Sequence, residues 1–389
     1  MNERHLDSAI SNHFNHYKQA LILLGARQVG KTTILQKIFP KSEYLSVDTE
    51  SIRQTLNKFD PTIYRQIINS SSLYVIIDEA HLLSDPGRTV KIIYDQLPQH
   101  KLIVTGSSAF YIKNKTSESM AGRKIEYHLY PLTLSEYLVQ MGVEEHLSYS
   151  IFEKIVSGRL KGPIIRPYDA RAILDNLLIF GSYPELLSVQ RDTKYLTNLV
   201  DSVVFKDLSE LSLLENKKAA ISLLRLLAHQ IGSQVNYAEL ASNLEISAIT
   251  VKRYIELFEQ SFIIFTLLPY STSQRDEIGK APKVYFYDLG LRNALIGNFS
   301  TLQNRNDKGA LFENFVITEL SKYNAYGDFG YHFNYWRTTA GSEVDLVLSR
   351  PGELLAIEIK STSRRVNRSF LTRYPGSKLS VITRDNYWV

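Results

Sequence analysis

The chain has 389 residues, enough for two or three domains at about 150 residues each. Hydrophobic residues make up 44% of it and charged residues 22%, which excludes a largely disordered chain. It has no cysteine, which excludes disulfides, thiolate nucleophiles and Cys-ligated metals, and its net charge of +5 is mild for this length.

The first 20 residues are polar and lack the apolar core of a signal peptide. The longest apolar runs, 73–77 and 262–268, fall well short of the roughly 20 residues that a membrane-spanning helix needs. We therefore expect a soluble, cytoplasmic protein with no membrane partner.

Short apolar runs alternate with helical patterns between residues 19 and 140. The runs lie at 20–24, 43–47, 73–77 and 102–105. Continuous apolar strands between helices predict a parallel sheet buried on both faces, and hence an α/β domain. We assign this domain to residues 1–150, because a polar stretch with Pro163 and Pro167 follows.

The remaining chain is expected to form three further parts. Residues 151–216 are predicted to be a helical extension or lid. The next segment has helices at 219–231, 237–244 and 249–260 and an apolar strand at 262–267. That order predicts a winged helix over residues 217–283, with Ile249 to Tyr254 in the position of the recognition helix. Strand-like segments and a further helix then form a C-terminal α/β domain, residues 284–389.

A phosphate-binding loop of the form G-x-x-x-x-G-K-[ST] is present at Gly25-Ala26-Arg27-Gln28-Val29-Gly30-Lys31-Thr32, after a predicted strand and before a predicted helix. Its glycines let backbone N–H groups face phosphate oxygens at the positive end of a helix dipole. Lys31 is expected to reach the β- and γ-phosphates, and Thr32 to give its hydroxyl to Mg²⁺. The candidate nucleotide site also includes the next residue, Thr33.

The apolar strand at 73–77 ends in two carboxylates, Asp78 and Glu79, as in a Walker B motif. Asp78 is expected to hold Mg²⁺ through water, and Glu79 to polarise the attacking water. The alternative is a pair of solvated acids at a strand end. Because the phosphate loop lies upstream, we predict nucleotide hydrolysis and not only binding.

The C-terminal domain carries a second pattern. Asp345 lies on an alternating strand, and Glu358 and Lys360 lie two residues apart on the next one, so their side chains emerge on one face. Asp followed by Glu-x-Lys on adjacent strands is the arrangement of PD-(D/E)xK nucleases, in which two carboxylates hold Mg²⁺ or Mn²⁺ and the lysine orients or activates water. Glu313, on the preceding helix, resembles an additional acid of some of these nucleases.

Basic side chains follow this pattern and favour a polyanionic partner such as nucleic acid. Between residues 361 and 389 they are Arg364, Arg365, Arg368, Arg373, Lys378 and Arg384, against a single acid, Asp385. Three interpretations stay open: a metal-dependent nuclease, a nucleic-acid-binding domain that does not cut, and a structural or protein-binding domain.

Further motifs occur along the chain in a fixed order. They are Thr105-Gly106-Ser107-Ser108, Glu118 to Arg123, Tyr130-Pro131-Leu132, Gly181 to Glu185, Tyr287 to Leu291 and Gly309 to Asn314. With the phosphate loop and Ile77 to His81, they resemble a family of bacterial and archaeal AAA-type (AAA+) P-loop ATPases. The resemblance covers nearly the whole chain. It implies an N-terminal AAA domain, a winged-helix middle and a C-terminal domain of unknown function with a restriction-endonuclease-like fold, and it implies ATP as the nucleotide.

The resemblance also suggests residues that sense the γ-phosphate. AAA-type ATPases place a polar sensor at the end of the strand that here precedes Ser107 and Ser108, so both serines are candidates. Arg123 is a candidate for stabilising transition-state charge, in cis or from a neighbouring subunit of a homo-oligomer. The alternative for Arg123 is an ordinary surface arginine.

The predicted winged helix has two alternative roles. Lys252 and Arg253 suit phosphate contacts, whereas Glu256 and Glu259 on the same helix would repel DNA. We favour a packing role, as a lid or arm on the nucleotide domain.

We therefore predict a Mg²⁺-dependent ATPase whose nucleotide cycle moves the winged-helix arm and regulates a C-terminal nuclease-like domain that acts on, or holds, nucleic acid. The alternative is a molecular switch or remodelling ATPase whose C-terminal domain binds a protein partner. A third class, a small-molecule kinase, is disfavoured by Glu79 beside Asp78 and by the large appended domains.

Overall fold

A computed structural model describes residues 3–106, 121–160, 166, 168–189, 191–202, 216–271, 281–338, 341–360 and 368–387. The chain divides into two compact units. The first centres on Met1–Tyr130 and takes in Gln260–Phe262. The second takes in Pro131–Val204, Leu214–Glu259 and Ile263–Val389.

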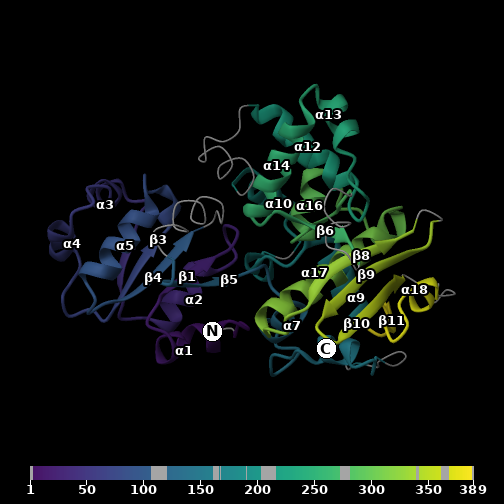
Figure 1. The fold of residues 1–389 in the computed structure, drawn as a ribbon, viewed down its shortest axis with the longest axis horizontal. Helices are drawn as coiled ribbons and strands as arrows, with labels where there is room; N and C mark the ends of the chain where they lie inside the picture. Colours follow the sequence, from purple (N-terminus) through teal and green to yellow (C-terminus); the bar gives the residue numbers. More distant parts are fainter. Residues whose placement is uncertain are drawn as a thin grey trace. The chain divides into compact units, whose positions relative to one another are not determined.

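The first unit is built on a parallel sheet with the strand order β2-β3-β4-β1-β5 (Figure 1). Its strands are β1 (Ala20–Leu24), β2 (Glu43–Ser46), β3 (Tyr74–Asp78), β4 (Lys101–Gly106) and β5 (Lys124–His128). Every residue of β1 is buried, as expected for a strand covered on both faces. The parallel sheet predicted from the apolar runs is confirmed.

Helices precede and separate the strands of this unit in sequence. They are α1 (Asp7–His16), α2 (Lys31–Ile38), α3 (Glu50–Leu56), α4 (Pro61–Ile67), η1 (Ala80–Leu82) and α5 (Pro86–Gln96). Asp60 and Asp85 cap α4 and α5 by accepting backbone N–H groups, and proline follows each at the first helical position. Because the strands are parallel, their carboxyl ends meet at one edge of the sheet, where the loops after β1 and β3 lie.

The chain enters the second unit at Pro131, before the boundary expected near residue 150. The backbone N–H of Leu134 donates to Glu319 Oε2 at 2.6 Å, and Lys322 Nζ donates to the carbonyl oxygen of Leu132 at 3.1 Å. Glu319 and Lys322 are both buried on α17 (Lys308–Tyr326) and pair with each other at 3.0 Å. This pair holds the segment after residue 131 against α17, 185 residues away in the sequence. No local sequence pattern indicates so distant a contact.

The second unit contains many helices in addition to α17. They are α7 (Leu134–Gln140), α8 (Ser150–Val156), α9 (Ala170–Phe180), η2 (Pro184–Leu187), α10 (Thr193–Val200), α12 (Lys217–His229), α13 (Tyr237–Leu244), α14 (Ala248–Gln260), α16 (Leu289–Leu295), η4 (Leu302–Asn304) and α18 (Ser369–Arg373). The helices at 219–231, 237–244 and 249–260 that the sequence predicts correspond to α12, α13 and α14.

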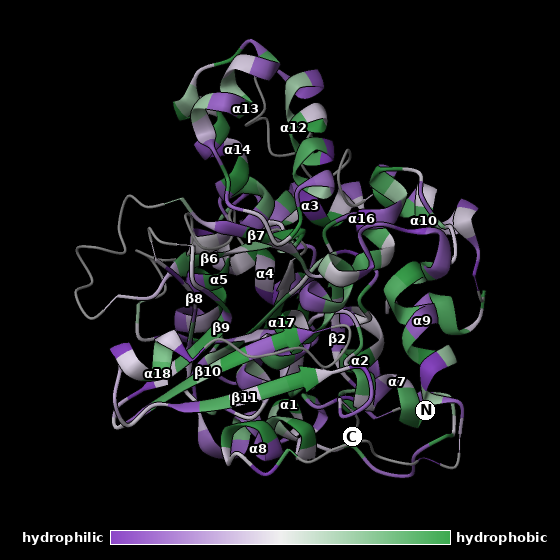
Figure 2. Ribbon diagram, turned by 90° about the vertical axis from the view of Figure 1, so that its right-hand side faces the viewer, coloured by the Kyte–Doolittle hydropathy of each residue, from purple (hydrophilic) through white to green (hydrophobic). Residues whose placement is uncertain are grey.

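A mixed sheet organises the second unit, with the order β11-β10-β9-β8-β6-β7. Its strands are β6 (Ile264–Pro269), β7 (Lys283–Phe286), β8 (His332–Arg337), β9 (Glu343–Arg350), β10 (Glu353–Lys360) and β11 (Lys378–Thr383). Strands β9 and β10 form an antiparallel pair, and β10 and β11 are parallel. Figure 2 shows hydrophobic residues along β10 and β11, as expected for strands inside a packed layer.

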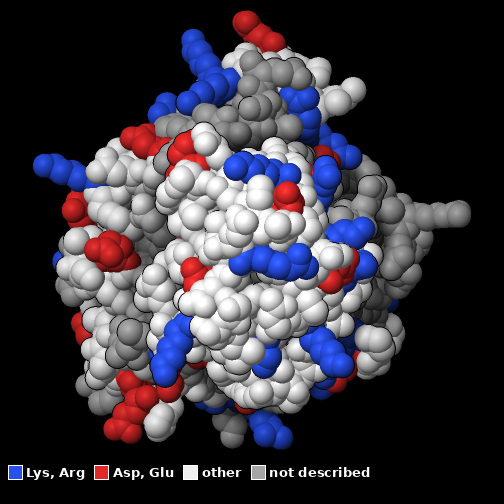
Figure 3. All heavy atoms as spheres, turned by 90° about the vertical axis from the view of Figure 1, so that its left-hand side faces the viewer, with Lys and Arg blue, Asp and Glu red and all other residues white. Residues whose placement is uncertain are grey.

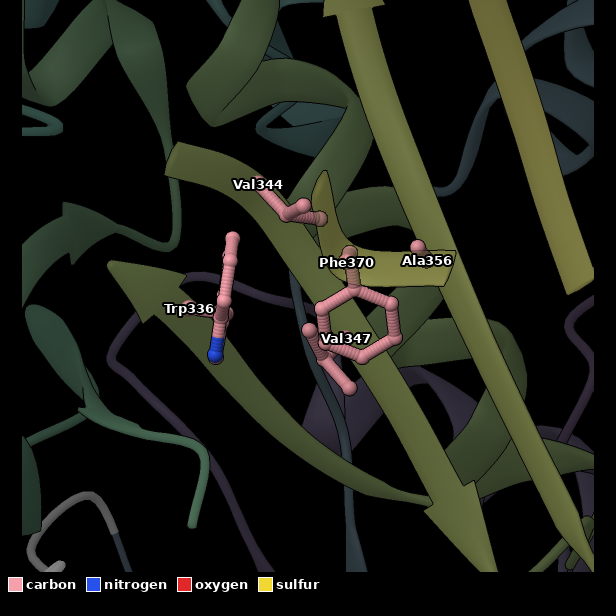
Figure 4. Packing of buried hydrophobic residues seen from close by; sticks show 5 residues of the cluster. All are labelled: Trp336, Val344, Val347, Ala356 and Phe370. Atoms are coloured by element: carbon pink, nitrogen blue, oxygen red, sulfur yellow. The ribbon is translucent and has the colours of Figure 1, made fainter. Parts of the chain in front are cut away.

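Layers of apolar side chains hold this sheet between helices. Helix α17 packs against β7 and β10. A buried cluster joins β8, β9 and β10 to α18; its members are Trp336, Val344, Val347, Ala356 and Phe370 (Figure 4). Burying the ring of Phe370 against the strands is worth about 2 kcal/mol from its removal from water, so α18 is held to the sheet mainly by apolar contact.

In the part of the chain that the structure describes, no helix combines the length and the apolar character needed to cross a membrane.

Candidate functional site

The phosphate loop lies between β1 and α2, at the carboxyl edge of the first sheet. Gly25 is required because a Cβ atom at this position would collide with the carbonyl oxygen of Leu129. Gly30 has φ of 97°, in the left-handed region that favours glycine, and immediately precedes α2. The two glycines therefore let the loop fold tightly in front of the helix N-terminus.

Lys31 is buried inside this loop. Its Nζ donates hydrogen bonds to the carbonyl oxygens of Gly25 and Ala26, each at 3.0 Å. The ammonium is therefore positioned where phosphate oxygens are its alternative acceptors. Of the other predicted loop residues, Gln28 and Thr33 are exposed, Arg27 is half-buried and Val29 is buried.

The carboxylate of Asp78, at the end of β3, accepts hydrogen bonds from several hydroxyl groups. Thr32 Oγ1 donates to Asp78 Oδ2 at 3.2 Å, Tyr44 Oη donates to the same oxygen, and Thr105 Oγ1 donates to Oδ1. Thr32 and Asp78, the two predicted Mg²⁺ residues of this unit, are thus in direct contact. Oxygen donors of this kind are the ligands that Mg²⁺ prefers, so the residues present fit the ion.

Glu79 follows Asp78 in a left-handed backbone conformation, with φ of 54°. Its carboxylate Oε2 lies 3.1 Å from Nδ1 of the buried His81. Burial favours the neutral acid, but the hydrogen bond from His81 and the positive charges of Lys31, His81 and Arg27 lower the pKa of Glu79 to about 2. Glu79 is therefore an anion that can accept a proton or orient water.

Several residues near this site have no role assigned by the sequence reasoning. Thr105 bonds Asp78 and also accepts the backbone N–H of Glu79 at 3.2 Å. Tyr44 and His81 contact the two carboxylates directly. Thr105 and His81 both lie inside sequence motifs, and this position could have identified them as site residues. Tyr44, on β2, belongs to no motif, so the sequence alone does not point to it.

Arg123 does not join this site within its own chain. Strands β1 and β5 pair from Ala20 with Lys124 to Leu24 with His128, and the phosphate loop follows Leu24. Arg123 therefore lies beyond the opposite end, five residue steps or roughly 16 Å along the strands. Its Nε pairs with Asp95 Oδ1 at 3.0 Å. The predicted sensors Ser107 and Ser108 lie outside the described residues.

In the second unit, Asp345 lies at an irregularity in β9. Between the pairs Asn334 with Val347 and Trp336 with Val344, β9 contains one residue more than β8. Such a bulge redirects side chains. The carboxylate Oδ2 of Asp345 accepts the backbone N–H of Ile359 in β10 at 2.7 Å. Asp345 is in this way brought to the end of β10 where Glu358 and Lys360 lie.

Glu358 and Lys360 complete this group. Lys360 Nζ lies 2.7 Å from Glu358 Oε2 and 3.6 Å from Asp345 Oδ2. Glu358 is only 2% exposed, and its other oxygen, Oε1, has no hydrogen-bond partner among the described residues. Burial disfavours the charged form of Lys360, but its bond to Glu358 and the charge of Asp345 raise its pKa, so the ammonium is retained. Burial raises the pKa of Glu358, with Asp345 acting in the same direction and Lys360 against it.

Glu313, the fourth predicted residue, has different partners. Its Oε1 accepts a hydrogen bond from Tyr285 Oη at 2.9 Å and lies 3.7 Å from Lys283 Nζ. Burial raises the pKa of Glu313 to about 7, with a contribution from Asp345. Across the described ranges, no three Asp, Glu or His side chains gather as a complete metal cage. A divalent ion at this group would therefore rest on Asp345 and Glu358 and on water or substrate oxygens.

The predicted winged-helix segment presents a mixed surface. On α14, Ile249 is 82% exposed and Lys252 is also exposed. Glu259 is turned inward, because its Oε1 accepts the N–H and the hydroxyl of Thr266 at 2.9 and 2.7 Å. Only Glu256 of the two acids is therefore exposed.

The basic residues after β10 are only partly available. Arg384 pairs with Asp175, whereas Arg368, Arg373 and Lys378 are exposed; Arg364 and Arg365 lie outside the described residues.

On the side of the molecule where α3 and α4 lie, Figure 3 shows basic and acidic side chains separated by uncharged surface. That face carries no continuous field of one sign among the described residues.

Family models match successive parts of the chain. Residues 17–138 match an AAA domain, residues 171–302 a domain of unknown function (DUF8612), and residues 308–385 a domain of unknown function (DUF4143). The first match contains the phosphate loop, Asp78 and Glu79. Together with the parallel sheet, it identifies an ATPase-like P-loop domain of the AAA type in the N-terminal part of the chain.

Relatives extend over most of the chain. An uncharacterized protein of Mycobacterium tuberculosis is 25% identical over 374 residues, which cover 94% of this chain and 77% of that protein. An uncharacterized protein of Methanocaldococcus jannaschii is 25% identical over 397 residues, which cover 95% of this chain and 81% of that protein. A solved Walker-type ATPase of Pyrococcus abyssi aligns with a TM-score of 0.47 and 14% identity, covering 76% of this chain and 96% of that one. None of these relatives gives a role to this chain.

Proposed function

We propose that this protein is a Mg²⁺-dependent ATPase whose second unit carries a metal-dependent, nuclease-like site acting on nucleic acid, and that the nucleotide regulates this site. The observation that carries the ATPase is the meeting of Lys31, Thr32 and Asp78 at one edge of the sheet. Hydrolysis, and not only binding, is supported by the anionic Glu79 beside them.

Each of these side chains has a separate task. Lys31 exchanges its two carbonyl acceptors for β- and γ-phosphate oxygens of ATP, and Thr32 and Asp78 hold Mg²⁺. The ion, when bound, neutralises charge that develops on the phosphates. Glu79 orients the attacking water and accepts its proton, and His81 holds the Glu79 carboxylate in place.

The proposed metal site of the second unit rests on one observation. A buried carboxylate oxygen, Glu358 Oε1, has no partner in the described structure, although it lies beside Asp345 and Lys360. Buried polar atoms are nearly always bonded, so an unpartnered oxygen beside Asp345 and Lys360 has room for a water molecule or an ion. Asp345 and Glu358 would hold Mg²⁺ or Mn²⁺, which would supply an activated water and polarise a phosphodiester. Because Lys360 keeps its proton, its task is to donate to water or to a phosphate oxygen, not to act as a base.

Two parts of the proposal concern the surroundings of these sites. We assign α12, α13 and α14 with β6 to a winged helix that packs as an arm rather than reading DNA. In support, Arg292 Nε on α16 donates to the carbonyl oxygen of Ala228 on α12 at 2.6 Å, which joins this segment to the rest of the second unit. Arg123, distant from the phosphate loop of its own chain, would act on the ATP of a neighbouring subunit.

The test measures cleavage and ATP hydrolysis on the same preparations. Circular single- and double-stranded DNA is incubated with Mg²⁺ or Mn²⁺, with and without ATP, using the wild type, Lys360→Ala and Lys31→Ala. We expect Lys360→Ala to lose cutting and keep hydrolysis, and Lys31→Ala to lose hydrolysis and the response of cutting to ATP. Lys194→Ala is the matched control, since Lys194 is an exposed lysine on α10 and belongs to neither site nor to the basic stretch.

Other results would point elsewhere. Hydrolysis without cutting under any condition would favour the molecular switch with a protein partner. Cutting that persists in Lys360→Ala would contradict the assigned site. Absence of ATP hydrolysis in the wild type would contradict the catalytic role of Glu79.

A further inference from the structure

The cluster around Glu313 contains a lysine with no role in the proposed chemistry. Lys283, the first residue of β7, is 3% exposed. Its Nζ pairs with Glu343 Oε1 and lies 3.7 Å from Glu313 Oε1. The ring of Tyr335 covers it, with the ring centre 5.3 Å from Nζ. Lysine is almost never buried to this extent without paired acids, so the ammonium is fixed where it lies.

The carboxylates of this region divide between two ammonium groups. Glu313 and Glu343 contact Lys283, whereas Asp345 and Glu358 contact Lys360. Glu343 and Asp345 lie two residues apart on β9, so the two halves are adjacent along one strand. Glu313 is further restrained by the hydroxyl of Tyr285. No side-chain atom of Lys283, Glu313 or Glu343 is among the buried, unpartnered polar atoms of the described residues, whereas Oε1 of Glu358 is.

We propose that Lys283 is a positioning residue that takes the place of a second divalent ion, so that the nuclease-like site holds one ion, at Asp345 and Glu358. This inference rests on the proposed metal-dependent function. In two-metal sites the ions lie about 3.5–4 Å apart and are held by a shared set of acids. Here a compact ammonium with three donors occupies the acids that would complete such a set.

The arrangement also explains why Glu313 is not a ligand of the ion. The single Lys283 ammonium lies near both Glu313 and Glu343 and offsets one of their two negative charges, which reduces their repulsion of Asp345. Without the ammonium, the carboxyl groups of Glu313 and Glu343 would be free to turn toward one ion, and carboxylate oxygens suit a hard divalent ion. Removal of Lys283 should therefore create a second ion site rather than weaken the first.

Mn²⁺ alone is the probe, and the number of ions bound per chain is the readout. The full chain is titrated with Mn²⁺ and the free ion is measured by electron paramagnetic resonance. All proteins carry Asp78→Asn, so that the phosphate loop contributes no ion. We expect one ion in this parent, two in Lys283→Met and one in Lys283→Arg, which restores the charge. Lys283→Gln, which keeps hydrogen-bonding capacity without charge, is expected to match Lys283→Met.

The outcomes separate this inference from the proposed function. One ion in the parent, in Lys283→Met and in Lys283→Gln, with unchanged affinity in folded proteins, would overturn the role of Lys283 and leave the metal site standing. Two ions in the parent would overturn it as well. No ion in any of these proteins would overturn the proposed metal site, and the role of Lys283 with it.

Discussion

The Nη1 atom of Arg4 donates a hydrogen bond to the carbonyl oxygen of Val29, 2.9 Å away inside the phosphate loop. Its Nη2 atom donates to the carbonyl oxygen of Tyr130 at 2.7 Å, and the side chain is buried. A single guanidinium therefore connects the loop that surrounds phosphate with the last residue of the first unit before Pro131. Arginine suits this task because its planar fork carries several donors in fixed directions.

Arg4→Gln is expected to weaken ATP binding about tenfold, which is about 1.4 kcal/mol. Glutamine is shorter and cannot serve both carbonyls, so the loop loses a support that holds it in a phosphate-binding shape. Titration with a fluorescent ATP analogue measures the dissociation constant. Arg65→Gln is the matched control, because Arg65 is exposed and bonds the carbonyl oxygen of Gln96. Equal affinity of Arg4→Gln and the wild type would show that the contact does not support the loop.

Thr105→Val is expected to lower the turnover of ATP about tenfold or more. The hydroxyl of Thr105 bonds Asp78 and accepts the N–H of Glu79, and valine keeps the shape of the side chain while removing both bonds. An unsatisfied buried partner costs about 1–3 kcal/mol. Steady-state ATP hydrolysis measures the effect, and Thr105→Ser, which keeps the hydroxyl, is expected to stay near the wild type. A serine variant as slow as the valine variant would assign the effect to packing.

The sequence predicts the phosphate loop well because its geometry is local. A strand, a glycine-rich turn and the first turn of a helix lie within a dozen residues, and their contacts to Lys31 come from the same segment. Asp78 and Glu79 are predicted for the same reason. The hydroxyls of Tyr44 and Thr105 reach Asp78 only because β2 and β4 flank β3, and strand order is not a local property.

The C-terminal cluster illustrates the same limit. The two-residue spacing of Glu358 and Lys360 follows from strand periodicity. The position of Asp345 depends on a bulge in β9, and a bulge has no signature in an alternating pattern. Lys283 lies 60 residues before Glu343, so only the packing of β7 beside the cluster shows that it is part of the same group.

His81→Ala is expected to shift the acidic limb of the turnover–pH profile to higher pH. In the wild type the hydrogen bond from His81 helps to lower the pKa of Glu79 to about 2 against the effect of burial. Without the imidazole, burial raises the pKa of Glu79, so the carboxylate becomes protonated, and inactive as a base, at a higher pH. Turnover at saturating ATP between pH 4 and 8 measures this shift.

Two variants control this experiment. Glu79→Gln is expected to bind ATP and to hydrolyse it slowly at every pH, because it has no titrating base. His81→Asn keeps a donor near Glu79 and is expected to show a smaller shift than His81→Ala. An acidic limb that is identical in His81→Ala and the wild type would remove His81 from the positioning of Glu79.

Asp307→Asn is expected to destabilise the second unit by about 2 kcal/mol at neutral pH, because hydrogen bonds to charged groups are lost. Asp307 bonds the buried Arg305 at 2.8 Å and Arg292 at 2.6 Å. The bond from Arg305 lowers the pKa of Asp307, with burial opposing and Arg292 adding to the effect. A carboxyl with a lowered pKa in the folded state contributes stability above its unfolded pKa, about 3.9, and loses it as the pH falls further. The difference from the wild type should therefore be constant from pH 7 to about 5 and shrink below about 4.

Urea unfolding followed by tryptophan fluorescence measures this difference, because Trp336 is buried in the second unit. Asp385→Asn is the matched control. Asp385 pairs with Arg171 at the surface, where such pairs contribute about 0–1 kcal/mol, so this variant should stay close to the wild type at every pH. A difference for Asp307→Asn that is as large at pH 3 as at pH 7 would mean that packing, and not the charge of Asp307, holds Arg292 and Arg305.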